Sequence, residues 1–349
     1  MKKIAYIELD THAELVENII TLSHELKKVD IHFFVSEKIA NLLSLNVNDK
    51  ISIANNKNIL TLLQKHHFDA VIIGTAHRYF NVFLEISNCF PTSILVHNAN
   101  FVQMSKRQLF SKIWENDIFF RLKLLLKEGL LIMPLLYRNA SSLLVLDENI
   151  STSMGKFQNK TKTISVFFNR FCNDKPNKMQ VVIPGAVSQY RRDYHHIFAK
   201  LKTMQSSMNF VFLGKASGSE LKLLNELQNT LSPTVAIKYF DHKVSKEKFQ
   251  TEMKEASVLW CPLQKEIKFF GQTEIYGLTK ISGNIGDAIN YGKIAILPTT
   301  YPCDYPFVLN ENLDIEQQLT SYHNTTFDFE NNYSIEKIAQ QLEELLCEI

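Results

Sequence analysis

Short runs rich in Val, Ile and Phe alternate with amphipathic stretches along the whole chain. The apolar runs occupy residues 3–9, 30–36, 69–75, 92–98 and 142–147 in the first half, and 181–187, 209–215, 234–240, 257–263 and 293–299 in the second. Apolar residues at helical spacing are found at 12–28, 193–204, 218–229, 245–256 and 281–291. Near-continuous apolar strands separated by helices predict parallel sheets that helices cover on both faces.

The alternation stops in a polar stretch at 151–180 and then restarts, which suggests two similar domains. A length of 349 residues agrees with this, since a domain usually has about 100–200 residues. We therefore expect two Rossmann-like α/β domains facing an interdomain cleft, at 1–165 and 166–330. Residues 331–349 should form an amphipathic helix that could pack back on the N-terminal domain. Parallel sheets bind ligands at the carboxyl ends of their strands, so the chemistry is expected there.

Composition narrows the class of protein. Hydrophobic residues make up 45% of the chain and charged residues 21%, which excludes a disordered protein. Lys and Arg number 38 against 36 Asp and Glu, so no strong field favours nucleic acid. The five cysteines form no CxxC motif, and we expect reduced thiols without a metal site in a cytoplasmic protein. The apolar run after MKK is too short for a signal peptide, and no run of 18 apolar residues predicts a spanning helix.

Glycine is scarce, with eleven in the chain, yet four of them fall within 271–286. Glycine permits positive φ angles and close approach of a ligand to the backbone. Within the helical pattern at 281–291 we expect the helix to begin near residues 285–287, and the residues just before it would form its N-terminus: Ser282, Gly283 and Asn284. Unpaired N–H groups at such a terminus suit a phosphate. The alternative is an ordinary loop followed by a capped helix.

Three charged residues of the same segment extend this prediction. Lys280 could add a positive charge, Glu274 could accept hydrogen bonds from hydroxyl groups, and Asp287 could cap the helix or bind a ribose diol. A basic pair lies after another strand: Gly185 and Ser188 precede Arg191 and Arg192, whose guanidinium groups suit a diphosphate. The pair could instead be solvated on a surface loop.

Several residues at other strand ends are weaker candidates. Lys215, in the GKASGSE segment, could line the nucleotide, or the segment could simply cap a helix. His12, His77 and His97 follow strands of the first half, where histidine could act as a base or bind sugar hydroxyls. Each could equally be a structural histidine. We select His12 and His97 as candidates on the catalytic side of the cleft.

The order of these features resembles the GT-B glycosyltransferases, particularly the retaining family 4 type. That family has a basic residue after the first strand of its C-terminal domain, then Glu-x-x-Gly, then acidic-Ala-x-x-x-Gly, then a strand ending in Pro. The corresponding segments are Arg191 or Arg192, Glu274–Gly277, Asp287–Gly292 and Pro298. The resemblance implies that the arginines and residues 282–284 hold a nucleotide diphosphate, that Glu274 binds the donor sugar, and that Asp287 binds the ribose.

The chain departs from the family pattern at two points. The usual Glu-x7-Glu spacing would place a carboxylate at Ser282, and LDTHAE stands where the family has a glycine-rich turn after the first strand. The resemblance nevertheless implies a metal-independent, retaining glycosyltransferase of the hexosyl type, with no cofactor beyond the nucleotide-diphosphate sugar donor. The expected pathway is surface-polysaccharide or glycolipid assembly, with a saccharide or lipid-linked saccharide as acceptor.

Residues 105–138 mix seven Lys and Arg residues with Phe, Trp and many Leu residues. A basic amphipathic helix of this kind can lie on the inner face of a membrane, while core-packed helices are the alternative. Two other functions stay open: a sugar-nucleotide epimerase of the same fold, and a non-catalytic nucleotide-binding assembly subunit. A Rossmann dehydrogenase is disfavoured because no GxGxxG motif follows a predicted strand.

Overall fold

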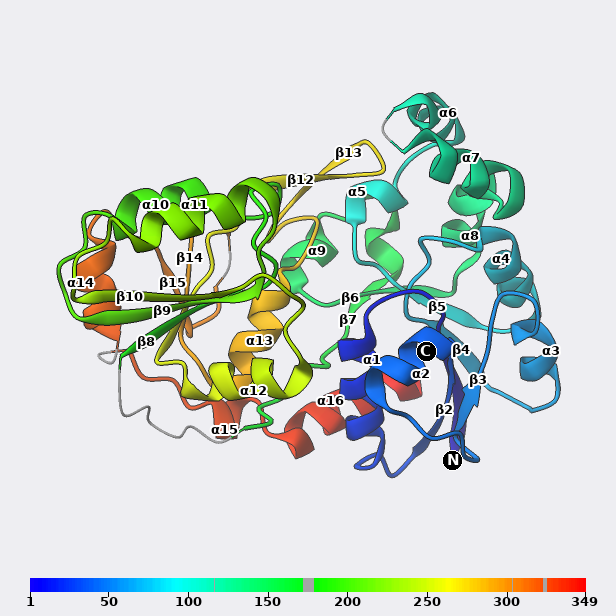
Figure 1. The fold of residues 1–349 in the computed structure, drawn as a ribbon. Helices are drawn as coiled ribbons and strands as arrows, with labels where there is room; N and C mark the ends of the chain where they lie inside the picture. Colours follow the sequence, from blue (N-terminus) through cyan, green and yellow to red (C-terminus); the bar gives the residue numbers. More distant parts are fainter. Residues whose placement is uncertain (116, 172–178, 303, 323–324) are drawn as a thin grey trace.

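The structure of the protein is a computed structural model. It describes residues 1–115, 117–171, 179–302, 304–322 and 325–349. Two lobes lie side by side, each built on one parallel sheet with helices on both faces (Figure 1). The two-domain α/β architecture predicted from the alternating pattern is confirmed.

The N-terminal sheet has the strand order β3-β2-β1-β4-β5-β6-β7, and every pairing is parallel. Its strands are β1 (Lys2–Glu8), β2 (Val29–Val35), β3 (Ile51–Ile53), β4 (Ala70–Ile73), β5 (Thr92–Leu95), β6 (Ser142–Val145) and β7 (Thr161–Thr163). Its helices are α1 (Ala13–Ser23), α2 (Glu37–Leu43), α3 (Ile59–Gln64), α4 (Phe80–Cys89), α5 (Ala99–Val102), α6 (Lys106–Ser111), α7 (Ile118–Lys127), α8 (Met133–Asn139) and α9 (Glu148–Thr152). Short 3₁₀ turns are η1 (Lys112–Trp114), η2 (Leu130–Ile132) and η3 (Gly155–Lys160).

The C-terminal sheet has the order β10-β9-β8-β11-β14-β15, again with parallel pairings. Its strands are β8 (Gln180–Pro184), β9 (Met208–Lys215), β10 (Val235–Phe240), β11 (Val258–Trp260), β14 (Ala295–Leu297) and β15 (Val308–Asn310). Its helices are α10 (Tyr194–Leu201), α11 (Gly218–Gln228), α12 (Lys246–Glu255), α13 (Gly283–Tyr291), α14 (Ile315–Thr320) and α15 (Phe329–Asn332). A separate antiparallel hairpin is formed by β12 (Glu266–Phe269) and β13 (Gln272–Ile275).

All ten predicted strands are present, because each contains an apolar run; most of these runs are buried on both faces of their sheet, whereas in β10 only Val235 is buried. The strands that the pattern missed are short or polar, as in the three-residue β7 with the sequence TKT. The 271–292 segment, expected to begin as a loop, begins instead as the second strand of the β12–β13 hairpin.

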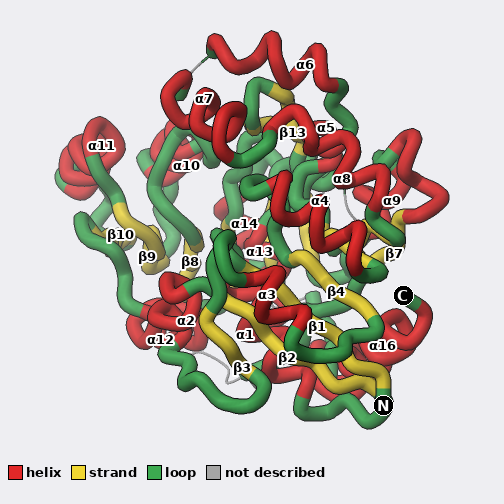
Figure 2. The backbone as a smooth tube through the Cα atoms, turned by 90° about the vertical axis from the view of Figure 1, so that its right-hand side faces the viewer, coloured by secondary structure: helices red, strands yellow, loops and turns green. Residues whose placement is uncertain are grey.

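The terminal helix α16 (Ile335–Glu348) returns to the N-terminal lobe and lies against α1 and β2 (Figure 2). Its apolar face carries Ile338, Leu342 and Leu346, which join the core that contains β1 and β2. The chain therefore crosses between the lobes twice, once after β7 and once before α16. Phe167, in the first crossing, packs against the cores of both lobes.

The 105–138 segment forms α6, η1, α7, η2 and α8 at one end of the N-terminal lobe (Figure 1). One face is core: Leu109, Ile113 and Leu124 are buried. The opposite face leaves large apolar side chains in solvent, namely Phe110, Trp114, Phe119, Phe120 and Leu126. None of the helices in the described parts of the chain has the length and apolarity that crossing a membrane requires.

Candidate functional site

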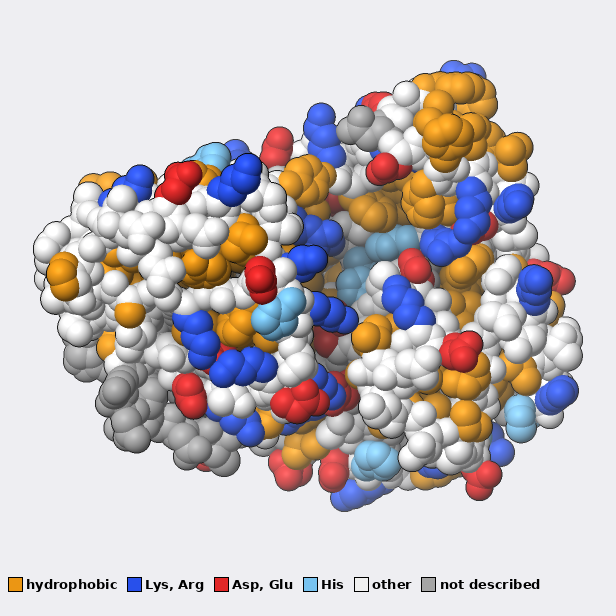
Figure 3. Space-filling model, in the orientation of Figure 1, with side chains coloured by type: hydrophobic (Ala, Val, Ile, Leu, Met, Phe, Trp, Pro, Cys, Tyr) orange, Lys and Arg blue, Asp and Glu red, His pale blue; other side chains and the backbone are white. Residues whose placement is uncertain are grey.

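A cavity of about 290 Å³ lies between the lobes, at the carboxyl ends of strands from both sheets. Both domains line it: His12, Glu14 and His97 from the N-terminal side, and Arg192, Lys280 and other residues from the C-terminal side. Lys, Arg and His side chains gather in the hollow between the lobes (Figure 3). The remaining predicted residues on its wall are Arg191, Ser282, Gly283 and Asp287.

Arg192 is the central cation of this site. It follows the turn after β8, and its guanidinium lies over Gly185, where a Cβ would collide with it. Gly185 has a φ of 103°, a conformation that favours glycine. Arg192 Nη2 donates to Asn284 Oδ1 at 3.3 Å, whereas its Nε is buried without a hydrogen-bond partner among the described residues. A half-buried guanidinium with an unused donor is suited to an incoming anion.

The N-terminus of α13 lies opposite that arginine. Ser282 caps the helix by accepting the N–H of Asn284, and Gly283 borders open space. Asn284 is not on the cavity wall but connects three elements, because its amide also contacts Pro184 O and Asp287 Oδ2. Burial raises the pKa of Asp287 to about 6, and the nearby Arg192 opposes that shift.

Lys280 connects the two domains at the edge of the cavity. Its Nζ donates to Asn98 Oδ1 at 3.0 Å, and Asn98 Nδ2 in turn donates to His77 Nε2 at 3.2 Å. Burial lowers the pKa of Lys280 to about 8. Burial, with His12 and Lys280 nearby, lowers the pKa of His77 to about 3. His77 is therefore neutral and lies behind the wall as a structural acceptor.

The N-terminal wall is formed by two stacked imidazoles. The His12 and His97 rings are 3.8 Å apart between centroids and tilted by 11°. His97 Nε2 donates to Gly74 O at 2.8 Å, because a carbonyl can only accept, and this leaves Nδ1 as the acceptor nitrogen. Burial, together with the neighbouring His12, lowers the pKa of His97 well below its usual value. His97 thus presents a neutral imidazole.

Glu8 supports this wall from beneath, a role that sequence reasoning missed. Its buried carboxylate accepts the N–H groups of Asp10 and Thr11 and the hydroxyl of Thr75. These bonds join the turn before His12 to the end of β4. His12 itself has a φ of 61°, an unusual value for a non-glycine residue, at the turn where the resembled family has glycine. The signal in the sequence was a lone acid at the end of the apolar run KIAYIE.

Besides Gly185 and Asn284, three predicted residues lie apart from the cavity wall. Glu274 is fully buried, and its carboxylate binds backbone N–H groups of α5 rather than facing the hollow. Lys215 ends β9 as an exposed side chain, and Ser188 contributes its carbonyl oxygen to the turn that carries both arginines. These positions give no support to a direct contact between Glu274 or Lys215 and the donor.

No group of three or more His, Cys, Asp and Glu side chains in the described residues could hold a metal ion. Among the cysteines, Cys89, Cys261 and Cys347 are free, while Cys172 and Cys303 lie outside the described residues.

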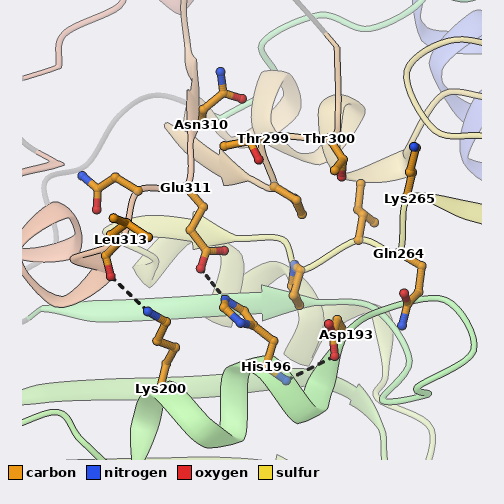
Figure 4. Close-up of a pocket in the computed structure, with 14 residues that line it drawn as sticks. Asp193, His196, Lys200, Gln264, Lys265, Thr299, Thr300, Asn310, Glu311 and Leu313 are labelled. Carbon is orange, nitrogen blue, oxygen red and sulfur yellow. Dashed lines mark hydrogen bonds and ion pairs between the residues drawn. The ribbon is translucent and has the colours of Figure 1, made fainter.

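A larger hollow of about 750 Å³ lies in the C-terminal lobe, beyond β11, β14 and β15 (Figure 4). His196 Nε2 contacts Glu311 Oε1 at 2.5 Å, and Trp260 Nε1 donates to Glu311 Oε2 at 2.9 Å. Asp193, also on its wall, caps α10 through the N–H of His196. Both carboxylates are therefore engaged within the protein. The adjacent His195 has no part in this wall, so the two histidines diverge as their spacing predicts.

Comparison with known proteins identifies the architecture. The chain matches no protein-family profile, and no curated protein sequence is significantly similar to it. Anabaena HepE, in a crystal structure with UDP and glucose, is similar at 13% identity over 100% of both chains, with a TM-score of 0.61. UDP-GlcNAc 2-epimerase from Neisseria meningitidis, bound to UDP-GlcNAc, is similar at 12% identity over 99% of this chain and 100% of the other, with a TM-score of 0.56. The lipopolysaccharide outer core galactosyltransferase WaaB is similar at 10% identity over 99% of this chain and 100% of the other, with a TM-score of 0.55. Such low identities bear on the fold alone, and the fold they establish is GT-B.

Proposed function

We propose that this protein is a glycosyltransferase that takes its sugar from a nucleotide-diphosphate donor. One observation carries the proposal: Arg192, Lys280 and the start of α13 converge from the C-terminal domain on a cavity whose opposite wall is the His12–His97 stack. Cations and helix N–H groups suit a diphosphate, and polar groups across a cleft suit an acceptor hydroxyl. Two of the similar structures hold UDP or a UDP-sugar, so uridine nucleotides are the first donors to test.

In the proposed reaction the bond between the anomeric carbon and the diphosphate oxygen breaks, and its electron pair leaves with the diphosphate. Arg192, Lys280 and the N–H groups of α13 would stabilise that charge, as preorganised donors do, without a metal ion. An acceptor hydroxyl bonds to the anomeric carbon and loses its proton. His97, neutral and with Nδ1 as acceptor, is the candidate base, and His12 the candidate contact to donor or acceptor. Asp287 is placed to accept a ribose hydroxyl. Retention at the anomeric carbon is part of the proposal on the resemblance alone.

A thermal-shift screen with UDP, GDP, CDP and ADP tests the donor assignment. A ligand that binds only the folded state adds about 2.7 kcal/mol of stability at 100 times its dissociation constant. We expect one nucleotide to raise the melting temperature, and expect the Arg191→Ala/Arg192→Ala double variant to lose that rise. If the double variant responds as the wild type does, the diphosphate assignment is wrong.

The similarity to UDP-GlcNAc 2-epimerase supports a second candidate function, that of a sugar-nucleotide epimerase. An epimerase would convert a sugar nucleotide with no acceptor present, whereas a transferase would need one. Incubating the protein with UDP-sugars alone, and following the sugar by NMR, separates the two. A non-catalytic assembly subunit would bind the nucleotide and convert nothing under either condition.

The acceptor in this proposal is a saccharide carried by a lipid, which would bring the protein to the inner face of a membrane from the cytoplasm. The support is the surface formed by α6, η1 and α7, where Trp114 is 65% and Phe119 87% exposed. The orange patch in the upper part of Figure 3 lies over these helices. Lys106, Arg107 and Lys127 accompany them in sequence, and Glu115 is paired with Lys112. Exposed aromatic residues among basic ones favour an anionic lipid surface.

A further inference from the structure

The β12–β13 hairpin extends from the C-terminal lobe over the N-terminal lobe, and β13 lies beside α5 in two views at right angles (Figures 1 and 2). Phe269, at the end of β12, packs on His77 at 4.6 Å and on Phe101 at 5.0 Å between ring centroids. Phe270, in the turn, receives the guanidinium of Arg121 of α7 at 4.7 Å from its ring centre. The hairpin therefore contacts both α5 and α7 of the other domain.

The first turn of α5 depends on the other domain for its hydrogen bonds. Helix N-termini leave N–H groups unpaired, and a side chain at the N-cap usually accepts one of them. The N-cap of α5 is Asn98, which makes no capping bond because its amide joins Lys280 to His77. Instead the N–H of Ala99 donates to Thr279 O at 2.9 Å. Asn100 and Phe101 donate to the two carboxylate oxygens of Glu274, at 3.3 and 2.8 Å.

We propose that the β12–β13 hairpin is an interdomain clasp in which Glu274 is a positioning residue. It holds the start of α5, and with it the preceding His97 and Asn98, in place against the C-terminal domain. This differs from the contact with donor sugar that the family resemblance implied for Glu274. If the lobes separate, all three N–H groups of the first turn of α5 lose their partners, so the cleft wall at His97 is complete only when the clasp is engaged.

The clasp is continuous with the proposed nucleotide site. A tight turn links Glu274 to Lys280, held by the bond from Gly277 N to Lys280 O at 2.8 Å and by a φ of 82° at Gly277. Ser282 and Gly283, on the cavity wall, follow at once. A nucleotide that orders this segment would therefore also order α5. This coupling rests on the proposed function, whereas the clasp itself does not.

Amide hydrogen exchange, resolved to single residues by NMR, tests the clasp without any ligand. In Glu274→Ala we expect the amides of Asn100 and Phe101 to exchange at least about tenfold faster than in the wild type, a change of ~1.4 kcal/mol in opening free energy. Glu266→Ala, an exposed position on the same hairpin, is the matched control and should leave both rates unchanged. Phe269→Ala is the second variant, for use if Glu274→Ala fails to fold. It removes the packing of the hairpin without leaving buried donors unpaired, and it should speed the exchange of the same two amides.

Equal exchange in the wild type and in whichever of the two variants folds would overturn the clasp. Addition of UDP then tests the coupling: we expect slower exchange at Ala99–Phe101 in the wild type, and UDP binding in the clasp variant that is weakened in proportion to the fraction of molecules whose clasp is open. UDP binding that leaves the α5 amides unchanged refutes the coupling. If none of UDP, GDP, CDP and ADP binds, the proposed function fails while the ligand-free comparison still decides the clasp.

Discussion

Replacing Arg192 with alanine should affect the free protein and the nucleotide complex in different ways. In the free protein the side chain has one hydrogen bond of 3.3 Å to Asn284 and one buried donor without a partner in the described residues. A typical hydrogen bond contributes about 0.5–1.5 kcal/mol, whereas an unsatisfied buried donor costs about 1–3 kcal/mol. The two contributions nearly cancel, so we expect the free energy of unfolding of Arg192→Ala to lie within about 1 kcal/mol of the wild type.

In the complex the same change removes hydrogen bonds between a guanidinium and a phosphate. Bonds to charged groups contribute about 1.5–3 kcal/mol, which weakens binding by roughly 10- to 150-fold. Urea unfolding of the free protein and calorimetric titration with the nucleotide that the screen selects measure the two quantities. Arg192→Lys should likewise leave the stability close to that of the wild type and recover only part of the affinity, because an ammonium lacks the planar fork. A variant that loses several kcal/mol of stability while binding nucleotide normally would show that Arg192 is structural.

Four further outcomes test the site and the exposed surface. The pKa of Asp287 is raised to about 6 from an unfolded value near 3.9, so its contribution to stability is lost as the pH rises from about 4 to about 6. Melting curves over this range should show a smaller loss in Asp287→Asn than in the wild type, because Glu8, whose pKa is raised to about 7, contributes a loss of its own in both proteins. The pKa of Lys280 is lowered to about 8, and a bound diphosphate should raise it. Calorimetric nucleotide titrations near pH 9, in buffers of different ionisation enthalpy, should therefore detect proton uptake on binding, and Lys280→Met should abolish that uptake. Gly185→Ala places a Cβ against a guanidinium at a φ of 103° and should destabilise the protein by about 1–3 kcal/mol and reduce nucleotide binding, measured by urea unfolding and titration. Trp114→Ser should reduce flotation with anionic liposomes at low salt, while Leu313→Ser, an exposed residue of the other lobe, should not; equal flotation would exclude the surface.

The fold could be predicted from the sequence where burial is complete on both faces of a strand. The apolar runs of β1, β4 and β9 favour strands, because they are short and because a helix covering a sheet would expose part of each run. The β12–β13 hairpin escaped detection because it belongs to neither sheet and packs on the other domain, so its alternation reflects contacts that only the assembled cleft provides. Phe270 and Gly271, both with positive φ, mark its turn.

The site could be predicted to the extent that the carboxyl ends of parallel strands share one edge. That rule alone brings His12, His97 and Arg192 to one cavity, although they are far apart in sequence. It fails for Lys215, which also ends a strand but projects into solvent, because the rule places a backbone position and not a side chain. It fails for Glu274 for a different reason. The hairpin places that carboxylate against the N-terminal domain, where it accepts backbone N–H groups of α5 instead of facing the cavity.

Three features of the cleft carry a cost in the free protein, and they come from different elements. Arg192 has a buried donor without a partner in the described residues, Lys280 has a lowered pKa, and His12 has a left-handed backbone conformation that costs about 1–3 kcal/mol. A diphosphate would relieve the first two, since it supplies acceptors and negative charge. It would not relieve the third, which lies on the opposite wall, where His12 stacks on His97 and its carbonyl accepts the N–H of Leu15. The same left-handed conformation begins α4 at Tyr79 and α7 at Asp117, so the stacked pair of His12 and His97, and not the backbone strain, is the feature of this wall that the proposed transferase uses.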